Sequence, residues 1–284
     1  ETKFGYKEIK DIEKDDEVYS FDITEQKRKL SKVLDKISSG KKECFKLSTR
    51  HNYIDVSKEH KILYYDKSEG LFKYKNTLDF KIGDLLILNG RKKIFRDIEI
   101  NKNRTVDNKN GYWNNLHLIP DYVNIEFAQL FGFLIGDGWL TKNTIFFAMG
   151  IYDELNQKYI NILNKLSGKQ CKLIKDYRTN TNTQVACGSK MLRNILVNMG
   201  FDGKSYSKRL PKWIFECSNE IKEAFLDGLI DSDGSSNIDE WNCERFNIEL
   251  VNEPLIKDIK LLAQSLGYKT GKICGRHPRP TKIN

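Results

Sequence analysis

Hydrophobic and polar positions follow two different spacings along the chain, and the change falls near residue 121. Before it, short runs of strand character are separated by turn residues, and no long stretch has helical periodicity. These runs lie at 17–21, 45–49, 61–65 and 85–88. The pattern predicts a β-rich domain over residues 1–95. A linker is predicted over 96–120, where Asn and Lys are frequent and Pro120 ends the stretch.

After residue 121 the apolar positions recur with helical spacing, interrupted by strand-like runs. The first set predicts helices over 125–138, 153–166 and 189–199, with strands over 144–147, 171–177 and 183–187. The second set predicts helices over 220–233 and 254–266, with strands over 245–251 and 269–274. Such self-similarity indicates an α/β duplication with halves at 121–205 and 206–284. Only 50 residues follow Gly234 (284 minus 234), so we expect the second half to lack its last helix.

The first helix of each set ends with the same arrangement of small and acidic residues. The two segments read LFGFLIGDG at 130–138 and LDGLIDSDG at 226–234. Small residues stand four apart in each segment and so share one helix face; they are Gly132 with Gly136, and Gly228 with Ser232. Because a glycine inside a helix costs about 1 kcal/mol relative to alanine, we expect this face to allow close contact between the two helices.

An Asp-Gly pair closes each of these helices, and Asp137 and Asp233 thereby place carboxylates at the negative end of the helix dipole. If the helices pack in parallel, the carboxylates converge, and Gly136 and Ser232 beside them complete a metal site. Mg²⁺, with Mn²⁺ as its substitute, takes such oxygen ligands and promotes phosphodiester hydrolysis. An ordinary helix-ending turn would explain one copy, but two copies in equivalent positions favour a site. We expect the closing glycine of each copy to take a positive φ; these are Gly138 and Gly234.

Both segments resemble the LAGLIDADG motif of homing endonucleases. The second departs from it only at Asp227 and Ser232, and the first is looser at Phe131, Phe133, Ile135 and Gly136. The resemblance covers residues 121–284 and implies an α+β fold in which two αββαββα halves are related by a pseudo-twofold axis. It implies that the motif helices form the interface, that the sheets enter the DNA major groove, and that the last Asp of each motif binds metal. A monomer that cleaves double-stranded DNA at a long asymmetric site is the expected enzyme.

A basic segment precedes the second motif. Residues 207–214, SKRLPKWI, resemble the Lys-x-x-Pro block of the same family, which makes Lys208 a candidate for stabilising charge on the scissile phosphate or orienting the water. A solvated loop lysine is an equally good interpretation from the sequence alone. Other basic residues of the sheets and loops are expected to face DNA phosphates or bases: Lys172, Lys175, Arg178, Lys190, Arg193, Arg209, Lys272, Arg276 and Arg279.

Composition supports a polyanionic partner only moderately. The 284 residues include 48 Lys and Arg against 39 Asp and Glu, a net charge of +9. This charge suits nucleic acid, but it also suits the lysine-rich surface of a protein from a biased genome. The six cysteines are scattered without CxxC spacing, which disfavours a zinc site and a disulfide framework and favours an intracellular location. No apolar run reaches about 18 residues, so no membrane span is expected.

The β-rich region resembles the Hint splicing domain of inteins. Residues 5–22, GYKEIKDIEKDDEVYSFD, and 72–88, FKYKNTLDFKIGDLLIL, match two of its conserved stretches, and 55–60, DVSKEH, resembles its Thr-x-x-His block. The resemblance implies that Ser57 and His60 polarise the peptide bond at the N-terminal splice junction. The exteins of a host protein would be the partners, and autocatalytic cleavage the chemistry.

Both ends of the chain depart from the intein pattern. Residue 1 is Glu where an intein has Cys or Ser, and residues 281–284, TKIN, lack its His-Asn pair. We therefore expect a chain trimmed at both ends, with splicing confined to a longer form. The leading hypothesis is a DNA endonuclease. The alternatives are an inactive nucleic-acid-binding module or maturase with the same fold, and an element that retains only protein splicing.

Overall fold

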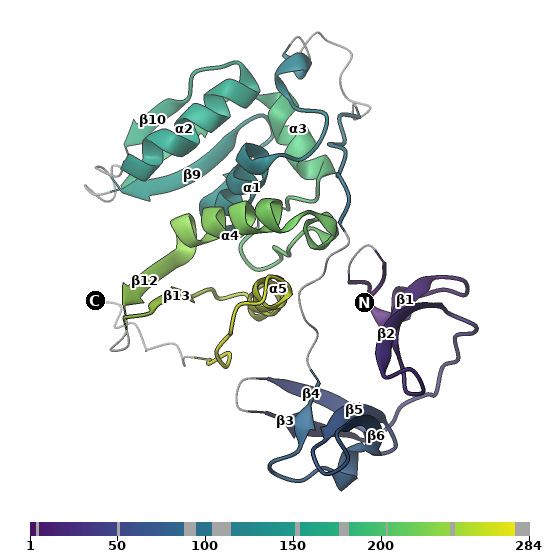
Figure 1. Cartoon of the computed structure of the whole chain (residues 1–284). Coiled ribbons are helices and arrows are strands. Elements are labelled where there is room, and N and C mark those ends of the chain that lie inside the picture. Colours follow the sequence, from purple (N-terminus) through teal and green to yellow (C-terminus); the bar gives the residue numbers. More distant parts are fainter. Residues whose placement is uncertain are drawn as a thin grey trace. The chain divides into compact units, whose positions relative to one another are not determined.

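The computed structural model of the protein describes residues 1–3, 6–49, 52–87, 95–103, 115–150, 154–175, 182–202, 204–238 and 242–275. The chain divides into two compact units (Figure 1). The first unit contains Glu1–Arg91 and Gly267–Asn284, and the second contains Lys92–Leu266. Within the described ranges, none of the helices combines the length and the apolar character that crossing a membrane requires.

The first unit is built from antiparallel strands, as the N-terminal pattern predicts. Its strands are β1 (Glu17–Asp22), β2 (Lys27–Lys32), β3 (Cys44–Ser48), β4 (Tyr53–Ser57), β5 (Lys61–Asp66), β6 (Leu71–Asn76) and β7 (Leu85–Leu86). They pair as β1 with β2, β3 with β4, and β6–β5–β7. Two 3-10 turns, η1 (Ile9–Asp11) and η2 (Thr77–Asp79), accompany them.

One glutamine joins the β1–β2 hairpin to β6. Gln26 lies in the hairpin turn, where its Nε2 donates to the Phe72 carbonyl (3.1 Å) and its Oε1 accepts from the Phe72 N–H (2.7 Å). The Phe72 ring also contacts the rings of Phe21 and Tyr65. Among the described residues of this unit, only Val56 and Thr77 are buried. The first unit is therefore held mainly by backbone pairing and a few half-buried aromatic contacts.

The first half of the second unit is a helix-covered sheet. Its elements are α1 (Ile125–Asp137), β8 (Gly138–Leu140), β9 (Ile145–Gly150), α2 (Glu154–Ser167), β10 (Lys172–Lys175), β11 (Asn182–Cys187) and α3 (Lys190–Asn198). The sheet is antiparallel with the strand order β10–β11–β9–β8, and α2 lies along it (Figure 1). The helices begin where the sequence allows a cap, because Asn124 and Ser189 accept from the backbone N–H three residues on. Helical spacing did not reveal the short strand β8.

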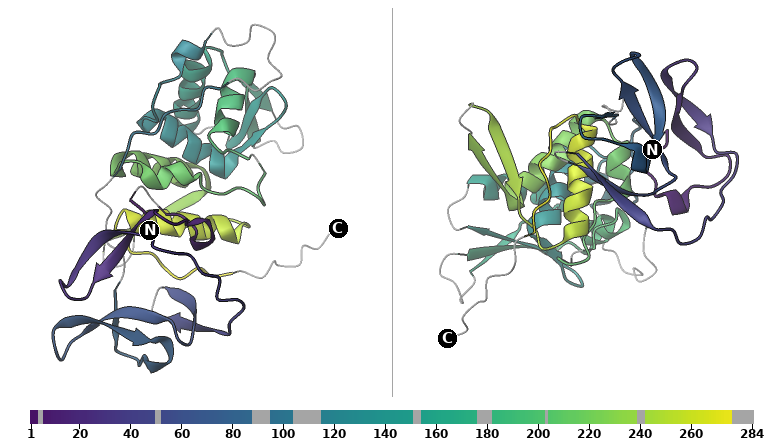
Figure 2. Two further views of the ribbon diagram at one scale, coloured as in Figure 1. Left: turned by 90° about the vertical axis from the view of Figure 1, so that its right-hand side faces the viewer. Right: turned by 90° about the horizontal axis from the view of Figure 1, so that it is seen from below.

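The second half repeats the order helix, strand, strand, helix. It contains η4 (Lys212–Glu216), α4 (Asn219–Asp233), β12 (Gly234–Ile238), β13 (Glu244–Ile248) and α5 (Glu253–Ser265). Strands β12 and β13 pair with each other, and α5 contacts α4 (Figure 2). The strand predicted over 269–274 is wrong, because none of these residues pairs with another strand. A strand needs a hydrogen-bonded neighbour, and within the described chain β12 and β13 pair only with each other.

Part of the predicted linker is packed into the second unit. The Arg96 N–H donates to the Glu216 carbonyl (2.9 Å), and the Val123 N–H donates to the Ile98 carbonyl (2.8 Å). Ile100 is 2% exposed, and the 3-10 turn η3 (Leu116–Leu118) contacts α2. The described part of 96–120 is therefore structured, because its few apolar side chains reach the core of the second unit.

Candidate active site at the ends of α1 and α4

Helices α1 and α4 touch through their backbones. A Cβ added to Gly132 would lie 1.9 Å from the carbonyl oxygen of Phe225, and one added to Gly228 would lie 2.0 Å from that of Gln129. Further along, a Cβ on Gly136 would meet residues 232 and 233. Since the contacts advance in the same direction on both helices, the helices are parallel. The small residues spaced four apart thus allow the close approach that the sequence predicts.

The glycines that close the two helices act differently from expectation. The predicted positive φ is wrong, because φ is −85° at Gly138 and −92° at Gly234. Each glycine begins a strand, and its N–H donates to the carbonyl four residues back, at Leu134 or Ile230. A Cβ there would lie 2.6 Å or 2.5 Å from that carbonyl oxygen. Glycine is required for this close approach to the last helical turn, and not for a left-handed conformation.

The structure brings the two predicted aspartates to the same end of the helix pair. The Cβ position of Gly136 is 2.8 Å from Asp233 Oδ2 and 2.0 Å from Ser232 Oγ, which itself donates to the Leu229 carbonyl (3.0 Å). Burial, followed by the charge of Asp233, raises the pKa of Asp137 to about 6. Burial also raises the pKa of Asp233. Two half-buried carboxylates therefore repel each other and resist ionisation.

Lys208 neutralises part of this charge while it caps α1. The Lys208 side chain is 3% exposed, and its Nζ donates to the carbonyls of Leu134 (3.3 Å), Gly136 (2.8 Å) and Gly138 (2.9 Å). An ammonium has three N–H donors, so all of them are used. Burial lowers the pKa of Lys208 to about 8, against the opposing charges of Asp233 and Asp137. The solvated-loop interpretation is excluded, because this lysine is a buried component of the site.

A link between α2 and α4 beside the site was not predicted. The hydroxyl of Tyr159 donates to Asp231 Oδ2 (2.5 Å), and Lys158 Nζ lies 3.0 Å from the same oxygen. The Tyr159 ring stacks on Phe133, with 3.7 Å between the ring centroids. Tyr159 lies on the apolar face of an amphipathic helix, where it resembles an ordinary core residue. Only the acidic partner on a distant helix reveals its second role.

The predicted DNA-contacting residues differ in their exposure and in the hydrogen bonds that they make to other groups of the protein. Lys172 and Lys272 are exposed, whereas the Nε and Nη2 of Arg209 pair with the two carboxylate oxygens of Asp258 at 2.5 and 2.8 Å. Arg193 donates from Nε to the Thr141 carbonyl (3.2 Å). Outside the described residues lie Arg178, Arg276, Arg279 and the side chain of Lys175.

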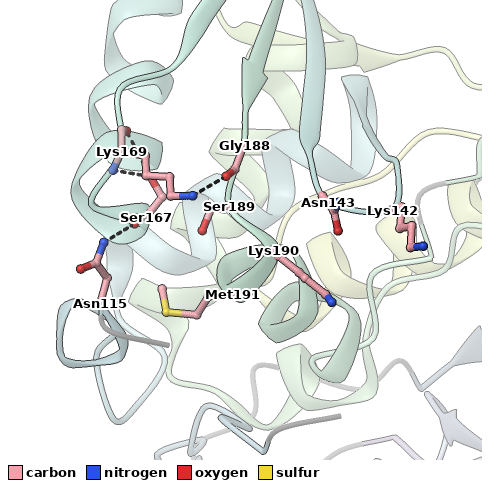
Figure 3. A pocket seen from close by; sticks show the side chains of 9 residues that line it. All are labelled: Asn115, Lys142, Asn143, Ser167, Lys169, Gly188, Ser189, Lys190 and Met191. Carbon is pink, nitrogen blue, oxygen red and sulfur yellow. Dashed lines mark hydrogen bonds between the residues drawn. The ribbon is translucent and has the colours of Figure 1, made fainter. Parts of the chain in front are cut away.

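Lys190 borders a cavity of about 220 Å³ (Figure 3). Lys142 and Lys169 also line it, and Lys169 Nζ donates to the Gly188 carbonyl (2.8 Å). Beside Lys169, the Asn115 amide donates to the carbonyl of Ser167 (3.0 Å). Neither aspartate of the candidate site lines this cavity. The space is basic, and it is separate from the carboxylates.

The predicted splicing residues lie in a turn of the first unit. Ser57 ends β4, and the His60 N–H donates to the Ser57 carbonyl (3.0 Å). The buried Thr77 hydroxyl lies within hydrogen-bonding distance of the carbonyls of Ser57 (3.0 Å) and His60 (3.1 Å). The turn is fixed by Thr77, while the His60 residue itself is exposed.

Known proteins are similar to parts of this chain. Residues 210–272 match the family model described as homing endonuclease. An iron–sulfur cluster assembly SufBD family protein of Mycobacterium leprae is 22% identical over 96% of this chain and 31% of its own length. An uncharacterized protein of Methanocaldococcus jannaschii is 32% identical over 52% of this chain and 18% of its own. The NrdEB subunit alpha of ribonucleoside-diphosphate reductase from Bacillus subtilis is 25% identical over 80% of this chain and 20% of its own length.

The chain thus spans less than a third of the length of these curated relatives. The region that matches the family model includes all of α4, with Asp233, and continues through β12, β13 and α5. This match supports a homing endonuclease, which is a DNA endonuclease.

Proposed function

We propose that this chain is a LAGLIDADG homing endonuclease of the intein type, which hydrolyses both strands of double-stranded DNA at a long asymmetric site with Mg²⁺. The observation that carries the proposal is the convergence of Asp137 and Asp233 at the ends of two parallel, backbone-contacting helices. A purely structural helix pair gains nothing from two carboxylates that repel each other. A divalent cation removes that repulsion.

The donor set fits a hard cation. Mg²⁺ prefers oxygen ligands and keeps several waters, and Asp137 with Asp233 supply two carboxylates. In the described part of the chain no group of three or more His, Cys, Asp or Glu side chains could hold a metal. The remaining ligands would therefore be water, phosphate oxygens and backbone carbonyls. When bound, Mg²⁺ would lower the pKa of the attacking water and neutralise charge on the leaving oxygen.

Lys208 acts in this proposal as a positioning residue. Its three hydrogen bonds hold the last turn of α1, which carries Asp137. For a direct contact with the scissile phosphate, the Lys208 ammonium would have to break one of these three hydrogen bonds to a carbonyl and donate to a phosphate oxygen instead. The Gly136 carbonyl, which is also a proposed metal ligand, already accepts from Lys208 at 2.8 Å. Lys208 thus sets where the carbonyls and the carboxylate point.

DNA would lie along the strands that follow the motif helices. Strands β12 and β13 are exposed over most of their length and carry polar side chains that can bond to base edges. On the first half, Lys172 is exposed at the edge strand β10. The two halves carry different residues and, over the described residues, different numbers of strands, so an asymmetric target fits them better than a palindrome.

Two observations support an association with protein splicing. The relatives named for iron–sulfur cluster assembly and for ribonucleotide reduction have unrelated tasks, yet each contains a segment similar to this chain. An element that resides in unrelated host proteins would have this distribution. In addition, the β-rich unit includes residues from both sides of the second unit in the sequence. This arrangement suits an endonuclease placed within a splicing domain that uses Ser57 and His60.

The test of cleavage uses the uninterrupted host gene as substrate. We expect the wild-type protein with Mg²⁺ to cut both strands, and we expect Asp137→Asn or Asp233→Asn to lose about a thousandfold in rate, since metal assistance is worth several kcal/mol. DNA binding in Ca²⁺ should stay within about threefold of wild type. If wild type binds this DNA but leaves it intact with Mg²⁺ or Mn²⁺, the protein is a binding module.

The test of splicing uses a precursor in which the chain is extended into its flanking sequences. We expect ligated exteins, and we expect His60→Ala to block cleavage at the N-terminal junction while leaving the far-UV circular dichroism unchanged. His117→Ala, in the second unit, is the matched control. An intact precursor in the wild-type reaction would contradict the splicing assignment and leave the endonuclease proposal unaffected.

A further inference from the structure

Two cysteines face each other across the β10–β11 pair. The register pairs Lys172 with Ala186 and Leu173 with Val185, so one step further it sets Cys171 opposite Cys187. Directly opposed residues of an antiparallel pair have Cα atoms about 4.5–5.5 Å apart. A disulfide accepts Cα separations of about 4.4–6.8 Å. Both cysteines are free thiols, and the expected Cα separation of this register lies within the range that a disulfide accepts.

The two sulfurs differ in how far they are buried. Cys187 is fully buried, and Cys171 is half-buried. Each thiol affects the titration of the other: the Cys171 thiol lowers the pKa of Cys187, and the Cys187 thiol together with burial raises the pKa of Cys171. Burial opposes this lowering of the Cys187 pKa, while Ser167, the charge of Lys169 and the Ser189 backbone add to it. Cys187 lies directly across the strand pair from Cys171, where its thiolate can attack a sulfur at position 171.

The backbone around the outer cysteine is fixed as well. The Cys171 N–H donates to Asn164 Oδ1 (2.7 Å), and Asn164 belongs to α2. Cys187 pairs with Ile145 of β9 on its other side. The backbone of each cysteine is thus held by a neighbouring element, so closure requires no rearrangement of the sheet.

We propose that Cys171 and Cys187 are a reversible redox modification site that closes to an intramolecular disulfide by exchange with a low-molecular-weight disulfide. The half-buried Cys171 first forms a mixed disulfide and releases one thiol. The Cys187 thiolate then attacks the sulfur of Cys171 and displaces the second thiol. The two cysteine protons pass to the two released thiols, the small disulfide is reduced, and the cysteine pair is oxidised.

Closure would secure the edge of the four-stranded sheet. Strand β10 has four residues, and among the described strands it pairs only with β11. Its Leu173 is 65% exposed. Such an edge strand opens easily. A bond between Cys171 and Cys187 closes a loop of 17 residues (187 minus 171, plus 1), which reduces the freedom of the unfolded chain and holds β10 in register.

The experiment uses the full chain with its three exposed cysteines replaced, as Cys44→Ser, Cys243→Ser and Cys274→Ser. Cys217 stays as an internal control, because it is buried and donates to the Trp213 carbonyl (3.5 Å). After incubation with glutathione disulfide, we expect non-reducing peptide mapping to show a 171–187 link and a free Cys217. The Tm should rise by about 5–10 °C, the β10 amides should exchange more slowly, and dithiothreitol should reverse both changes.

A further replacement, Cys187→Ala, distinguishes the reaction of Cys171 with glutathione disulfide from the later formation of the 171–187 disulfide. In this variant we expect a stable glutathione adduct on Cys171, because no second thiol can displace it. The proposal is overturned if the unaltered pair also retains glutathione on Cys171, since the sulfur is then reachable but the pair does not close. It is equally overturned if neither thiol reacts, or if the linked peptides contain Cys217.

Discussion

The two halves of the second unit begin alike and end differently. In both, a helix with small residues four apart leads through Asp-Gly directly into a strand. In the first half that strand joins a four-stranded sheet in which Phe147 and Val185 are buried beneath helices. In the second half β12 and β13 pair only with each other in the described chain and remain largely exposed. The same local pattern therefore fixes the helix end, whereas burial of the sheet depends on what covers it.

The largest effect is expected from removing a ring from each sheet. Phe147→Ala empties a fully buried position of β9 and should lower the free energy of unfolding by about 3–5 kcal/mol. Phe246→Ala removes a ring that is 50% exposed on β13 and should change it by less than about 0.5 kcal/mol. Urea denaturation followed by circular dichroism measures both. Equal losses of free energy of unfolding would show that the β12–β13 pair is buried to the same extent as the four-stranded sheet.

The next effect tests the helix contact that the two halves share. Gly132→Ala drives a Cβ into the Phe225 carbonyl and should lower the free energy of unfolding by about 2–3 kcal/mol, because the helix axes must separate. Gly188→Ala is the matched control, since its Cβ would meet no atom within 4 Å. We expect the control to be neutral in the same urea titration. A tolerated Gly132→Ala would mean that α1 and α4 do not touch through their backbones.

A smaller effect distinguishes a buried lysine from a surface lysine. Lys208→Met keeps the length of the side chain but leaves three carbonyls without their donor, so we expect a loss of about 1–2 kcal/mol. Lys204→Met, at an exposed neighbouring position, should be neutral. Thermal denaturation compares the two variants. If they behave alike, Lys208 does not cap α1.

The smallest effect is expected in how the free energy of unfolding of the metal-free protein depends on pH. The folded-state pKa of Asp137, about 6, lies above its ordinary value of 3.8, so between these pH values the folded protein retains a proton that the unfolded chain has lost. The free energy of unfolding therefore falls as pH rises from about 4 to about 6. Asp137→Asn removes the part of this fall that Asp137 causes, while the raised pKa of Asp233 leaves a remainder. The variant should be more stable than wild type at pH 8 by about 1 kcal/mol, after allowance for partial exposure.

Chemical denaturation at pH 4, 6 and 8 in chelator measures this difference. Mg²⁺ should stabilise wild type at pH 8 and have little effect on the Asn variant. An unchanged ranking of the two proteins across the pH series would contradict the proposed repulsion at the helix ends.

Much of the site was predictable because its determinants are close in sequence. The spacing of Gly228 and Ser232 marks a contact face, and an Asp-Gly pair marks the helix end. Lys208 could be selected as a candidate, but its partners could not, because they lie about 70 residues earlier, at the end of α1 and the start of β8. The Tyr159–Asp231 bond and the Cys171–Cys187 pair escaped prediction for the same reason. Each depends on which strands and helices become neighbours.

By itself the sequence determined the elements whose hydrogen bonds are local. The side chains of Asn124, Ser189 and Ser218 each accept a hydrogen bond from the backbone N–H three residues later. These capping residues fix the starts of α1, α3 and α4. The tertiary structure alone decided that Gly138 and Gly234 take extended backbone and that 269–274 forms no strand. A helix satisfies its backbone within a few residues, whereas a strand, a buried ammonium or a carboxylate pair needs partners supplied by distant parts of the chain.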